Sequence, residues 1–432
     1  MGLCSRIVCK SCEKIDGEDE MRFIADFHIH SKYSHATSKY MDLLSLALWG
    51  QLKGITVMGT GDFTHPLWQK ELKEELQEAE TGLFELKPSY QKKVQEQVYA
   101  SCQSLQRFML TAEISTIFKR NGRCYRIHSL VLAPGFNEME RISASLAKIG
   151  NIASDGRPIL GCDVKEVVKI ALDASSDCMV IPAHIWTPWF GLFGSKSGFN
   201  SVYECFEELT DYIYALETGL SSNFLMNARL SQLDRFTLLC NSDAHSVQKL
   251  GREANIINAE LSYDGIVKAL KDRSSNGVTA GIEFFPECGK YYADGHRSCT
   301  VYMSPEETIS HKGICPVCHK SLTIGVSYRV NQLADRTELQ AKEYMRKRYR
   351  VIPLFDILAQ HFQMAESSQK VQTAYHHLVK EIGSEFFILL KAPLDRIERE
   401  SNKAIAQSIA RLRTGDVLFL PGYDGVYGTV QF

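Results

Sequence analysis

Apolar runs and amphipathic stretches alternate along most of the chain, from residue 21 to about residue 286. The run at residues 22–27 has the composition of a buried strand, whereas residues 39–52 place apolar side chains at helical spacing. Further strands are expected at residues 55–58, 107–114, 125–132, 179–183, 212–217, 236–240 and 278–285, with helices between them at 67–80, 87–105, 137–149, 163–173, 223–233 and 262–271. Regular alternation of strands and helices predicts an α/β fold with a parallel sheet, either open or closed into a barrel.

Polar side chains gather where these expected strands end. Asp26, His28 and His30 come at the end of the first strand, and at alternate positions of an extended chain they would project to the same side. The same kinds of residue end or follow the later strands: His35, Asp62, His65, Glu113, His128, His184, Glu217, Asp243 and His245. Folds of this class place their chemistry at the carboxyl ends of the strands.

Each of these residues, taken alone, has a structural explanation. His128 could be a core histidine with a hydrogen-bond partner, and Glu113 could cap a turn. Taken together they need another explanation, because many buried imidazoles and carboxylates require cations to neutralise them. Nitrogen and oxygen ligands without thiolates suit Zn²⁺, Mn²⁺ or Fe²⁺. The set therefore predicts a metal centre at one end of the sheet.

The order and spacing of these residues resemble the polymerase-and-histidinol-phosphatase (PHP) superfamily over about residues 21–286. The matching motifs are His28-x-His30, Asp62 with His65, Glu113, His128, His184 and Asp243-x-His245. The resemblance implies a distorted (β/α)7 barrel that holds two or three divalent metals, with Zn, Mn, Fe and Mg as the candidates. It also implies hydrolysis of a phosphoester, in which metals clamp the attacking and leaving oxygens.

The family pattern assigns ligands to three metal positions. The implied sets are His28, His30, Glu113 and Asp243 for one metal, Glu113, His128 and His184 for a second, and His35, His65 and His245 for a third. Position 35 is often Asp in the family, so His35 departs from the pattern. The second motif is usually a compact Thr-Asp-His, whereas two residues separate Asp62 from His65 here. We take His65 as the ligand and Asp62 as a supporting residue.

Carboxylates carry the remaining predictions at this centre. Glu113 would set the spacing of two metals, and it and Asp243 are expected catalytic residues. Glu217 ends a strand without an assigned metal, so it is either a third catalytic carboxylate that orients water or substrate, or a structural residue. Asp26 has no metal in the family pattern and is expected to orient a ligand imidazole.

An aromatic loop with several glycines follows His184. Its candidate contacts with nucleic acid are Trp186, Trp189, Phe190 and Lys196. Aromatic rings at the mouth of an active site suit stacking on a base. The alternative is a lid that packs on the rim of the barrel.

Residues 287–329, beyond the barrel, carry a second metal pattern. His296-x2-Cys299 is followed after fifteen residues by Cys315-x2-Cys318, which is the spacing of a zinc ribbon. These four ligands predict one structural Zn²⁺ in a closed tetrahedral site, with Cys288 as a competitor for the position of His296. Unligated loop cysteines are the alternative.

Residues 330–432 are predicted to form a mainly helical, DNA-binding domain. Arg346, Lys347 and Arg348 lie in a basic cluster on an expected helix and could follow a phosphate backbone. A solvated helix face has the same charge pattern and is the alternative. Two later segments, residues 369–382 and 394–412, are also expected to be helical.

The arrangement from residue 21 to the end resembles the endonuclease Q family, most specifically at residues 26–38, 59–66, 217–223 and 289–318. The resemblance implies a DNA-repair endonuclease that hydrolyses the phosphodiester 5′ of a deaminated base (uracil, hypoxanthine or xanthine) or an abasic site. Two alternatives are a PHP-type phosphatase of a small metabolite and a non-catalytic nucleic-acid-binding protein. The ribbon and the basic cluster favour the nuclease over the phosphatase, and the complete ligand set argues against a non-catalytic protein.

Composition limits the setting of this activity. The chain has 432 residues, a net charge of -2 and 13 cysteines, and no apolar run approaches the length of a membrane span. The charge confines any DNA-binding surface to a local patch, and the odd number of cysteines without a secretory leader predicts a reducing, cytoplasmic setting. Residues 1–20 are expected to be a disordered extension. We expect a monomer whose partner is damaged DNA, with a sliding clamp or another repair protein as a further candidate partner.

Overall fold

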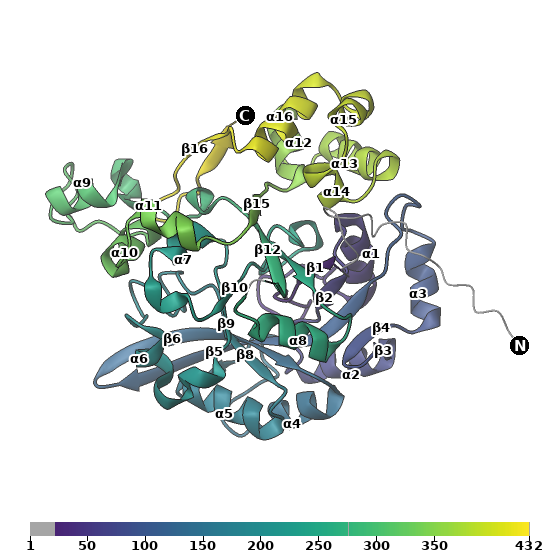
Figure 1. Ribbon diagram of the computed structural model, residues 1–432, viewed down its shortest axis with the longest axis horizontal. Coiled ribbons are helices and arrows are strands. Elements are labelled where there is room, and N and C mark those ends of the chain that lie inside the picture. The colour runs from purple at the N-terminus through teal and green to yellow at the C-terminus, as the bar shows by residue number, and fades with distance from the viewer. Residues whose placement is uncertain (1–21, 275, 432) are drawn as a thin grey trace, which may run out of the picture.

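The computed structural model describes residues 22–274 and 276–431. The prediction for residues 1–20 lies outside the described residues. Figure 1 shows a strand-rich region with α4 (Phe136–Leu146) and α5 (Val164–Ala174) below it, and the C-terminal helices above it in yellow and green. Within the described ranges, no helix combines the length and the apolar character that crossing a membrane requires.

Most strands of the barrel region form one mixed sheet. They are β1 (Arg22–Asp26), β2 (Val57–Gly59), β5 (Arg107–Arg120), β6 (Arg123–Ala133), β7 (Ile159–Leu160), β8 (Met179–Pro182), β11 (Ala254–Asn258) and β12 (Val278–Glu283). Two further strands, β9 (Ala215–Glu217) and β10 (Thr237–Leu239), pair in parallel as a separate sheet. β1, β2 and β5 run parallel, whereas β6 is antiparallel to β5 and β8, and β11 is antiparallel to β1 and β12. The predicted α/β class is confirmed, but the expected parallel sheet is wrong for β6, and β11 is an antiparallel strand that the sequence pattern did not predict.

β5 and β6 form a long hairpin, which explains the departure from parallel order. Asn121 and Gly122 connect the two strands with φ of 52° and 78°. Asn-Gly favours the two-residue turn whose twist matches a hairpin, and such a turn requires antiparallel strands. The register places Ser115 opposite His128, so Glu113, two residues earlier on β5, lies on the same face as His128.

Side-chain amides bridge the gap between β10 and β1. Asn255 of β11 donates to Cys240 O at 2.7 Å and accepts from Cys240 N at 2.9 Å. Asn241 Oδ1 accepts from Phe27 N at 3.0 Å. These bonds satisfy backbone groups that no neighbouring strand reaches, and they fix the end of β1 beside the loop that carries Asp243.

Helices cover the outside of this region. Those within residues 22–274 are α1 (Leu43–Lys53), α2 (Pro66–Glu75), α3 (Pro88–Gln95), α4, α5, α6 (Val202–Phe206), α7 (Phe224–Ala228) and α8 (Tyr263–Lys271). Side-chain caps mark several starts; Asp163, for example, accepts from Lys165 N before α5. The helix expected at residues 67–80 ends at Glu75, because β3 (Leu76–Glu80) pairs with β4 (Leu83–Leu86) in a hairpin.

The C-terminal part begins with a small metal-ligand segment and continues into helices. Its elements are β13 (Asp294–His296), β14 (Val301–Met303), α9 (Pro305–Ser310), α10 (Val326–Leu333), α11 (Glu338–Ala341), β15 (Arg348–Arg350), α12 (Leu354–Phe362), α13 (Gln369–Glu381), α14 (Glu385–Leu390), α15 (Leu394–Glu400), α16 (Lys403–Thr414), β16 (Leu418–Leu420) and β17 (Thr429–Gln431). β15 pairs in parallel with β12 and so joins the C-terminal part to the barrel sheet. The basic cluster was expected on a helix, and this prediction is wrong, because its last residues form the strand β15.

Candidate metal centres

Four side chains converge at the end of β1, and we call them the first metal group: His28, His30, Glu113 and Asp243. One ligand atom of each lies within 4.8 Å of the others. His30 Nε2 is 3.1 Å from Asp243 Oδ1 and 3.3 Å from Glu113 Oε2. His28 Nε2 faces the same two carboxylates at 3.6 and 3.7 Å, and it is buried without a hydrogen-bond partner. A cation between these atoms would give His28 Nε2 the partner that it lacks.

A second metal group shares Glu113 with the first: Glu113, His128 and His184. Glu113 Oε1 is 2.7 Å from His128 Nδ1 and 3.0 Å from His184 Nε2. Burial lowers the pKa of His128 to about 4, so its imidazole is neutral, which is the form that binds a metal. The two oxygens of Glu113 thus face different groups, as a bridging carboxylate requires.

Buried carboxylates hold the outer nitrogens of the first group. Glu217 accepts from His28 Nδ1 at 2.9 Å, and Asp62 accepts from His30 Nδ1 at 3.0 Å. Such contacts set the tautomer and orientation of a ligand imidazole and increase its basicity. Glu217 also accepts from Asn241 Nδ2 and His184 N, and its side chain is only 1% exposed. The structure therefore gives Glu217 a positioning role, and the predicted contact with water or substrate is wrong.

Asp26 does not contact an imidazole, so its predicted role is wrong. Its carboxylate accepts from Ser242 N at 3.0 Å and from Gly251 N at 3.1 Å. Burial raises the pKa of Asp26 to about 6. The side chain fixes the backbone beside Asp243 instead of orienting a ligand.

Three of the residues at this centre have a left-handed backbone. The φ angles are 51° at Asp62, 28° at His184 and 48° at Asp243. Residues other than glycine seldom adopt such angles, and they persist where the surrounding structure enforces them, often at functional sites. The backbone strain is therefore concentrated at residues that carry or orient ligand atoms.

The imidazoles of the first group compete for protons as well as for metals. Burial by itself would lower the pKa of His28 and His30, but carboxylates outweigh it, chiefly Glu217 and Glu113 for His28 and Asp62 for His30. Both pKa values are consequently well above the usual value of an imidazole. A cation that binds here displaces these protons, which makes its affinity depend on pH.

The two carboxylates of the first group are held in their ionised form. Burial would raise the pKa of Glu113, but the neighbouring imidazoles of His128 and His28 and the guanidinium of Arg157 outweigh it and hold the pKa well below the usual range. The pKa of Asp243 is likewise lowered, because the hydrogen bond from His30 and the charge of His28 overcome the effect of burial. Two ionised carboxylates together with two imidazole nitrogens are a donor set that fits a divalent cation.

The three histidines predicted for a third metal are not gathered in the same way. His65 Nε2 donates to Ala153 O at 3.1 Å, and its Nδ1 is buried without a hydrogen-bond partner. His35 is 80% exposed, 3.8 Å from Asp155. The His245 ring lies tilted against that of His30, with ring centroids 4.4 Å apart. These contacts do not bring the three histidines together as a ligand set, so a third metal stays a prediction.

Arg157 also lies at this centre, although no sequence pattern pointed to it. Its Nη1 donates to Glu113 Oε2 at 3.1 Å. Residues 155–157 belong to the connection between α4 and α5, away from any expected strand end. Only the adjoining Gly156 could have drawn attention to this segment, since a conformationally free residue suits a close approach of the backbone.

The aromatic loop after His184 is divided between the core and the rim. Trp186 is 1% exposed and donates to Asn227 at 2.8 Å, so its predicted stacking on a base is wrong. Trp189 is 39% exposed and packs edge-on against Tyr291. Tyr291 lies in residues 287–329, which we call the zinc segment. Phe190 lies 4.4 Å from the His128 ring, centroid to centroid. The rim beside the second metal group therefore offers Trp189 and Phe190, along with the exposed Lys196.

A third cluster lies in the C-terminal part, and we call it the zinc group: His296, Cys299, Cys315 and Cys318. Their ligand atoms all lie within 4.8 Å of one another, and Cys318 Sγ is 3.6 Å from His296 Nδ1. Burial raises the pKa of Cys315, but backbone N–H groups of Cys318 and Val317 outweigh it and lower the pKa. Cys288 is buried elsewhere and does not belong to the group.

The predicted basic cluster is partly used for packing. Arg348 pairs with the buried Glu283 at 3.4 Å, and Arg346 donates to Phe236 O at 3.5 Å. Lys347 is exposed. DNA contact by all three remains a prediction, and only Lys347 has the exposure that a phosphate contact favours.

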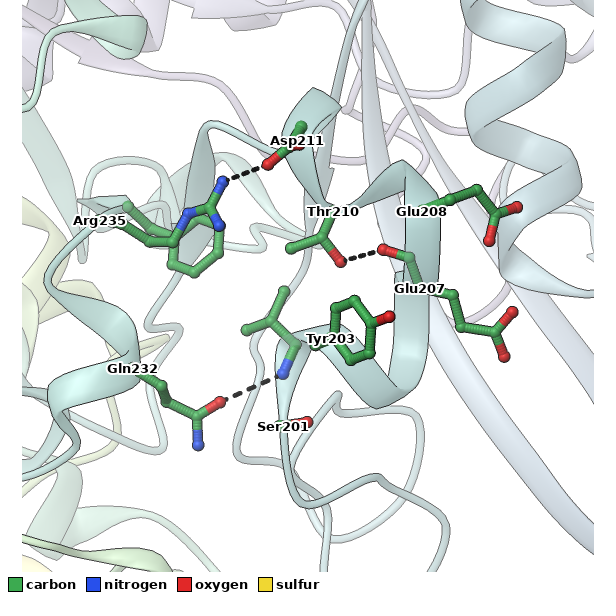
Figure 2. A pocket seen from close by; sticks show the side chains of 10 residues that line it. Ser201, Tyr203, Glu207, Glu208, Thr210, Asp211, Gln232 and Arg235 are labelled. Atoms are coloured by element: carbon green, nitrogen blue, oxygen red, sulfur yellow. Dashed lines mark hydrogen bonds and ion pairs between the residues drawn. The ribbon is translucent and has the colours of Figure 1, made fainter.

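A separate hollow of about 410 Å³ lies beside α6. Polar side chains that line it are already paired within the protein (Figure 2): Arg235 pairs with Asp211 at 2.7 Å, and Gln232 accepts from the backbone N–H of Val202 at 3.2 Å. None of its ten lining residues belongs to a metal group. We assign no function to this hollow.

Two sequence relatives carry names that state no activity. The uncharacterized protein YqxK of Bacillus subtilis is 30% identical over 309 residues, which cover 71% of this chain and 74% of that protein. The uncharacterized protein MJ0043 of Methanocaldococcus jannaschii is 29% identical over 255 residues, 57% of this chain but only 31% of its own length. Residues 353–416 match the family model described as the MJ0043 C-terminal domain.

Solved structures extend the likeness over nearly the whole chain. The lesion-specific endonuclease PfuEndoQ from Pyrococcus furiosus has a TM-score of 0.81 at 28% identity, and the match covers 95% of this chain and 96% of that one. Endonuclease Q in complex with a 27-mer duplex substrate, with an abasic lesion at its active site, has a TM-score of 0.79 at 27% identity and covers 95% and 97%. Each match leaves only about 5% of this chain uncovered.

Proposed function

The chain belongs to the endonuclease Q family, and on this premise we propose that it is a metal-dependent DNA-repair endonuclease. One observation carries the proposal: Glu113 joins two metal groups in a chain whose fold covers 96% and 97% of the length of two endonuclease Q structures. A carboxylate between two cations is an arrangement that supports in-line displacement at phosphorus, because the two cations stabilise the attacking and the leaving oxygen. The reaction forms one bond from a water oxygen to phosphorus and breaks one bond from phosphorus to a deoxyribose oxygen.

The proposed substrate is DNA with a deaminated base (uracil, hypoxanthine or xanthine) or an abasic site, cut 5′ of the lesion. Support comes from the related endonuclease Q complex, whose duplex carries an abasic lesion at the active site. The deaminated bases follow from the sequence resemblance. Trp189 and Phe190 lie on the rim beside His128, where a ring could stack on a neighbouring base.

The mouth of the barrel is proposed to hold two divalent ions, Zn, Mn, Fe or Mg, and the ribbon one structural Zn²⁺. The unpartnered His28 Nε2 and the ionised Glu113 and Asp243 fit a cation between them. When bound, the ions polarise the phosphodiester and lower the pKa of a water molecule. A third ion would need His35, His65 and His245 to come together.

The protein's own residues prepare the mouth for this chemistry. Glu113 fixes the distance between the two groups, and Glu217 and Asp62 hold the imidazoles of His28 and His30. Asp243 is 27% exposed, the most open member of the first metal group, so it borders the position where substrate enters.

Labelled oligonucleotides that carry uracil, hypoxanthine, xanthine or an abasic site test the proposal. Metal-free protein is loaded with Mn²⁺, Mg²⁺ or Zn²⁺ and incubated with each duplex and with an undamaged one. We expect a single nick 5′ of the lesion and none in the undamaged strand. The product is sized on a denaturing gel.

His28→Ala serves as the variant that should be inactive, and Arg235→Ala, far from the metal groups, as the matched control that should stay active. Absence of a nick with every lesion and metal, together with turnover of a small phosphomonoester, would instead establish a phosphatase on the same barrel.

A further inference from the structure

The segment Asp155-Gly156-Arg157 is built to deliver one arginine to the metal mouth. Arg157 Nη1 donates to Glu113 Oε2 at 3.1 Å, and this oxygen is the one that faces His28 and His30. The guanidinium therefore borders the position on which the first metal group converges.

Several contacts hold this segment in place. Gly156 N donates to Tyr33 O at 3.0 Å, and Asp155 Oδ1 accepts from Arg157 N at 3.1 Å. A Cβ at Gly156 would lie only 2.4 Å from Asp62 Oδ2, so the backbone approaches the carboxylate that orients His30 more closely than any other residue type allows. On the other side, Ser115 N donates to Pro158 O at 3.0 Å. The position of Arg157 is thus fixed from both sides.

Arg157 differs from the arginines that serve packing in this chain. The guanidinium of Arg120 bonds to Asp163 and to the carbonyl oxygens of Glu204 and Cys205. The guanidinium of Arg157 makes a single hydrogen bond within the described residues, to Glu113, while its side chain is 26% exposed. None of its remaining nitrogens is a buried atom without a partner, so these N–H groups are accessible to solvent.

We propose that Arg157 binds a non-bridging oxygen of the scissile phosphate and stabilises the negative charge that this group gains in the transition state. The inference rests on the proposed function and adds a residue that contacts substrate. Arginine suits the task, because its planar fork donates two parallel hydrogen bonds to phosphate and its charge does not titrate. The bond to Glu113 keeps the fork aimed before substrate arrives, so little reorganisation is needed during the reaction.

Arg157→Ala tests the role, with Arg157→Lys as the conservative variant and Arg235→Ala as the control for loss of one positive charge. Single-turnover nicking of an abasic duplex should slow about 10²–10³-fold in Arg157→Ala, and less in Arg157→Lys. Metal content should stay unchanged in all three variants. Added guanidinium chloride at millimolar concentration should restore part of the Arg157→Ala rate, which no purely structural role predicts.

A second measurement keeps this inference separate from the proposed function. Titration of the metal-loaded protein with inorganic phosphate, followed by calorimetry, should show at least tenfold weaker binding in Arg157→Ala than in wild type. If wild type nicks DNA while Arg157→Ala retains both its rate and its phosphate affinity, the inference is overturned and the proposed function stands. If wild type nicks no substrate, the proposed function fails, and the phosphate titration alone decides the role of Arg157.

Discussion

The barrel mouth and the zinc segment each gather metal ligands, but they differ in what holds those ligands. In the mouth, His28 and His30 are fully buried, and each has its outer nitrogen fixed by a carboxylate of the surrounding barrel. In the zinc segment, the buried apolar cluster found among the described residues consists of Met303, Leu322 and the ligand Cys315. So small a core cannot order a segment by itself.

The difference indicates opposite relations between metal and fold. The mouth exists because the barrel has folded, so a cation adds reactivity to a site that is already shaped. We expect the zinc segment to need a cation to become ordered, as small zinc modules do, because ligand bonds would take the place of a hydrophobic core. The predictions below test this contrast, beginning with the largest expected effect.

Asp243→Asn should abolish nicking while leaving the fold intact. Asparagine keeps the shape of the side chain and tolerates the positive φ of this position. It removes one of the two negative charges of the first metal group and leaves that of Glu113. We expect a loss of at least about 10³-fold in rate, equivalent to about 4 kcal/mol of transition-state stabilisation. DNA affinity, measured by fluorescence anisotropy, should change little. A large loss of affinity would mean that Asp243 shapes the mouth rather than its chemistry.

Cys315→Ser should unfold the zinc segment without disturbing the barrel. The variant should bind one zinc equivalent fewer, and amide hydrogen exchange should lose protection across β13 and β14 while β5 and β6 keep theirs. The reason is the size of the ligand contribution, about 10–16 kcal/mol in isolated zinc modules. We also expect weaker DNA binding.

Cys124→Ser, an exposed cysteine outside the zinc group, is the matched control and should leave zinc content and exchange unchanged. Retained protection across β13 and β14 in Cys315→Ser would break the contrast, because the segment would then fold without its metal.

Glu217→Gln should weaken metal binding in the mouth without removing a ligand. Glutamine has one acceptor where Glu217 uses two oxygens for His28, His184 N and Asn241, so donors would face donors. Loss of such a support costs about 10–100-fold in metal affinity. Calorimetric titration with Mn²⁺ measures the effect. Glu208→Gln, at an exposed carboxylate outside the metal groups, should show none.

How far the sequence leads also differs between the two regions. The zinc group depends on local spacing, and its four ligands were predictable from the intervals between them. The mouth depends on strand ends, which worked for Glu113 and His128 because the hairpin keeps them on one face. The same reasoning failed for Asp26, because β1 ends there and the alternation of side chains does not extend beyond it.

Contacts between distant segments lay outside the reach of pattern reasoning. Arg157 comes from a connection without strand or helix periodicity, and it meets Glu113 only because Gly156 lets the backbone approach Asp62. The antiparallel β6 is different, since the Asn121-Gly122 turn is a hairpin signal present in the sequence itself. The contact of Arg157 can be found only in the folded structure, whereas the antiparallel direction of β6 could have been predicted from the residues of the turn.

The smallest effect concerns protons at the mouth. Glu217 and Glu113 raise the pKa of His28, and Asp62 raises that of His30. Both imidazoles of the metal-free protein are therefore in the positively charged, doubly protonated form at pH 6.5. A metal must displace them, so its apparent affinity falls as pH falls, by about tenfold per pH unit for each proton released. Calorimetry with Mn²⁺ in two buffers of different ionisation enthalpy counts these protons.

Glu217→Gln should reduce that count, because His28 without the facing carboxylate loses its proton at a lower pH and has less to release on metal binding. The overall affinity of the variant falls while its pH dependence becomes shallower, a combination that mere loosening of the mouth does not produce. An unchanged proton count would show that Glu217 orients His28 without setting its charge. The carboxylates behind the imidazoles would then prepare the mouth by geometry alone, and the contrast with the zinc segment would rest on packing rather than on electrostatics.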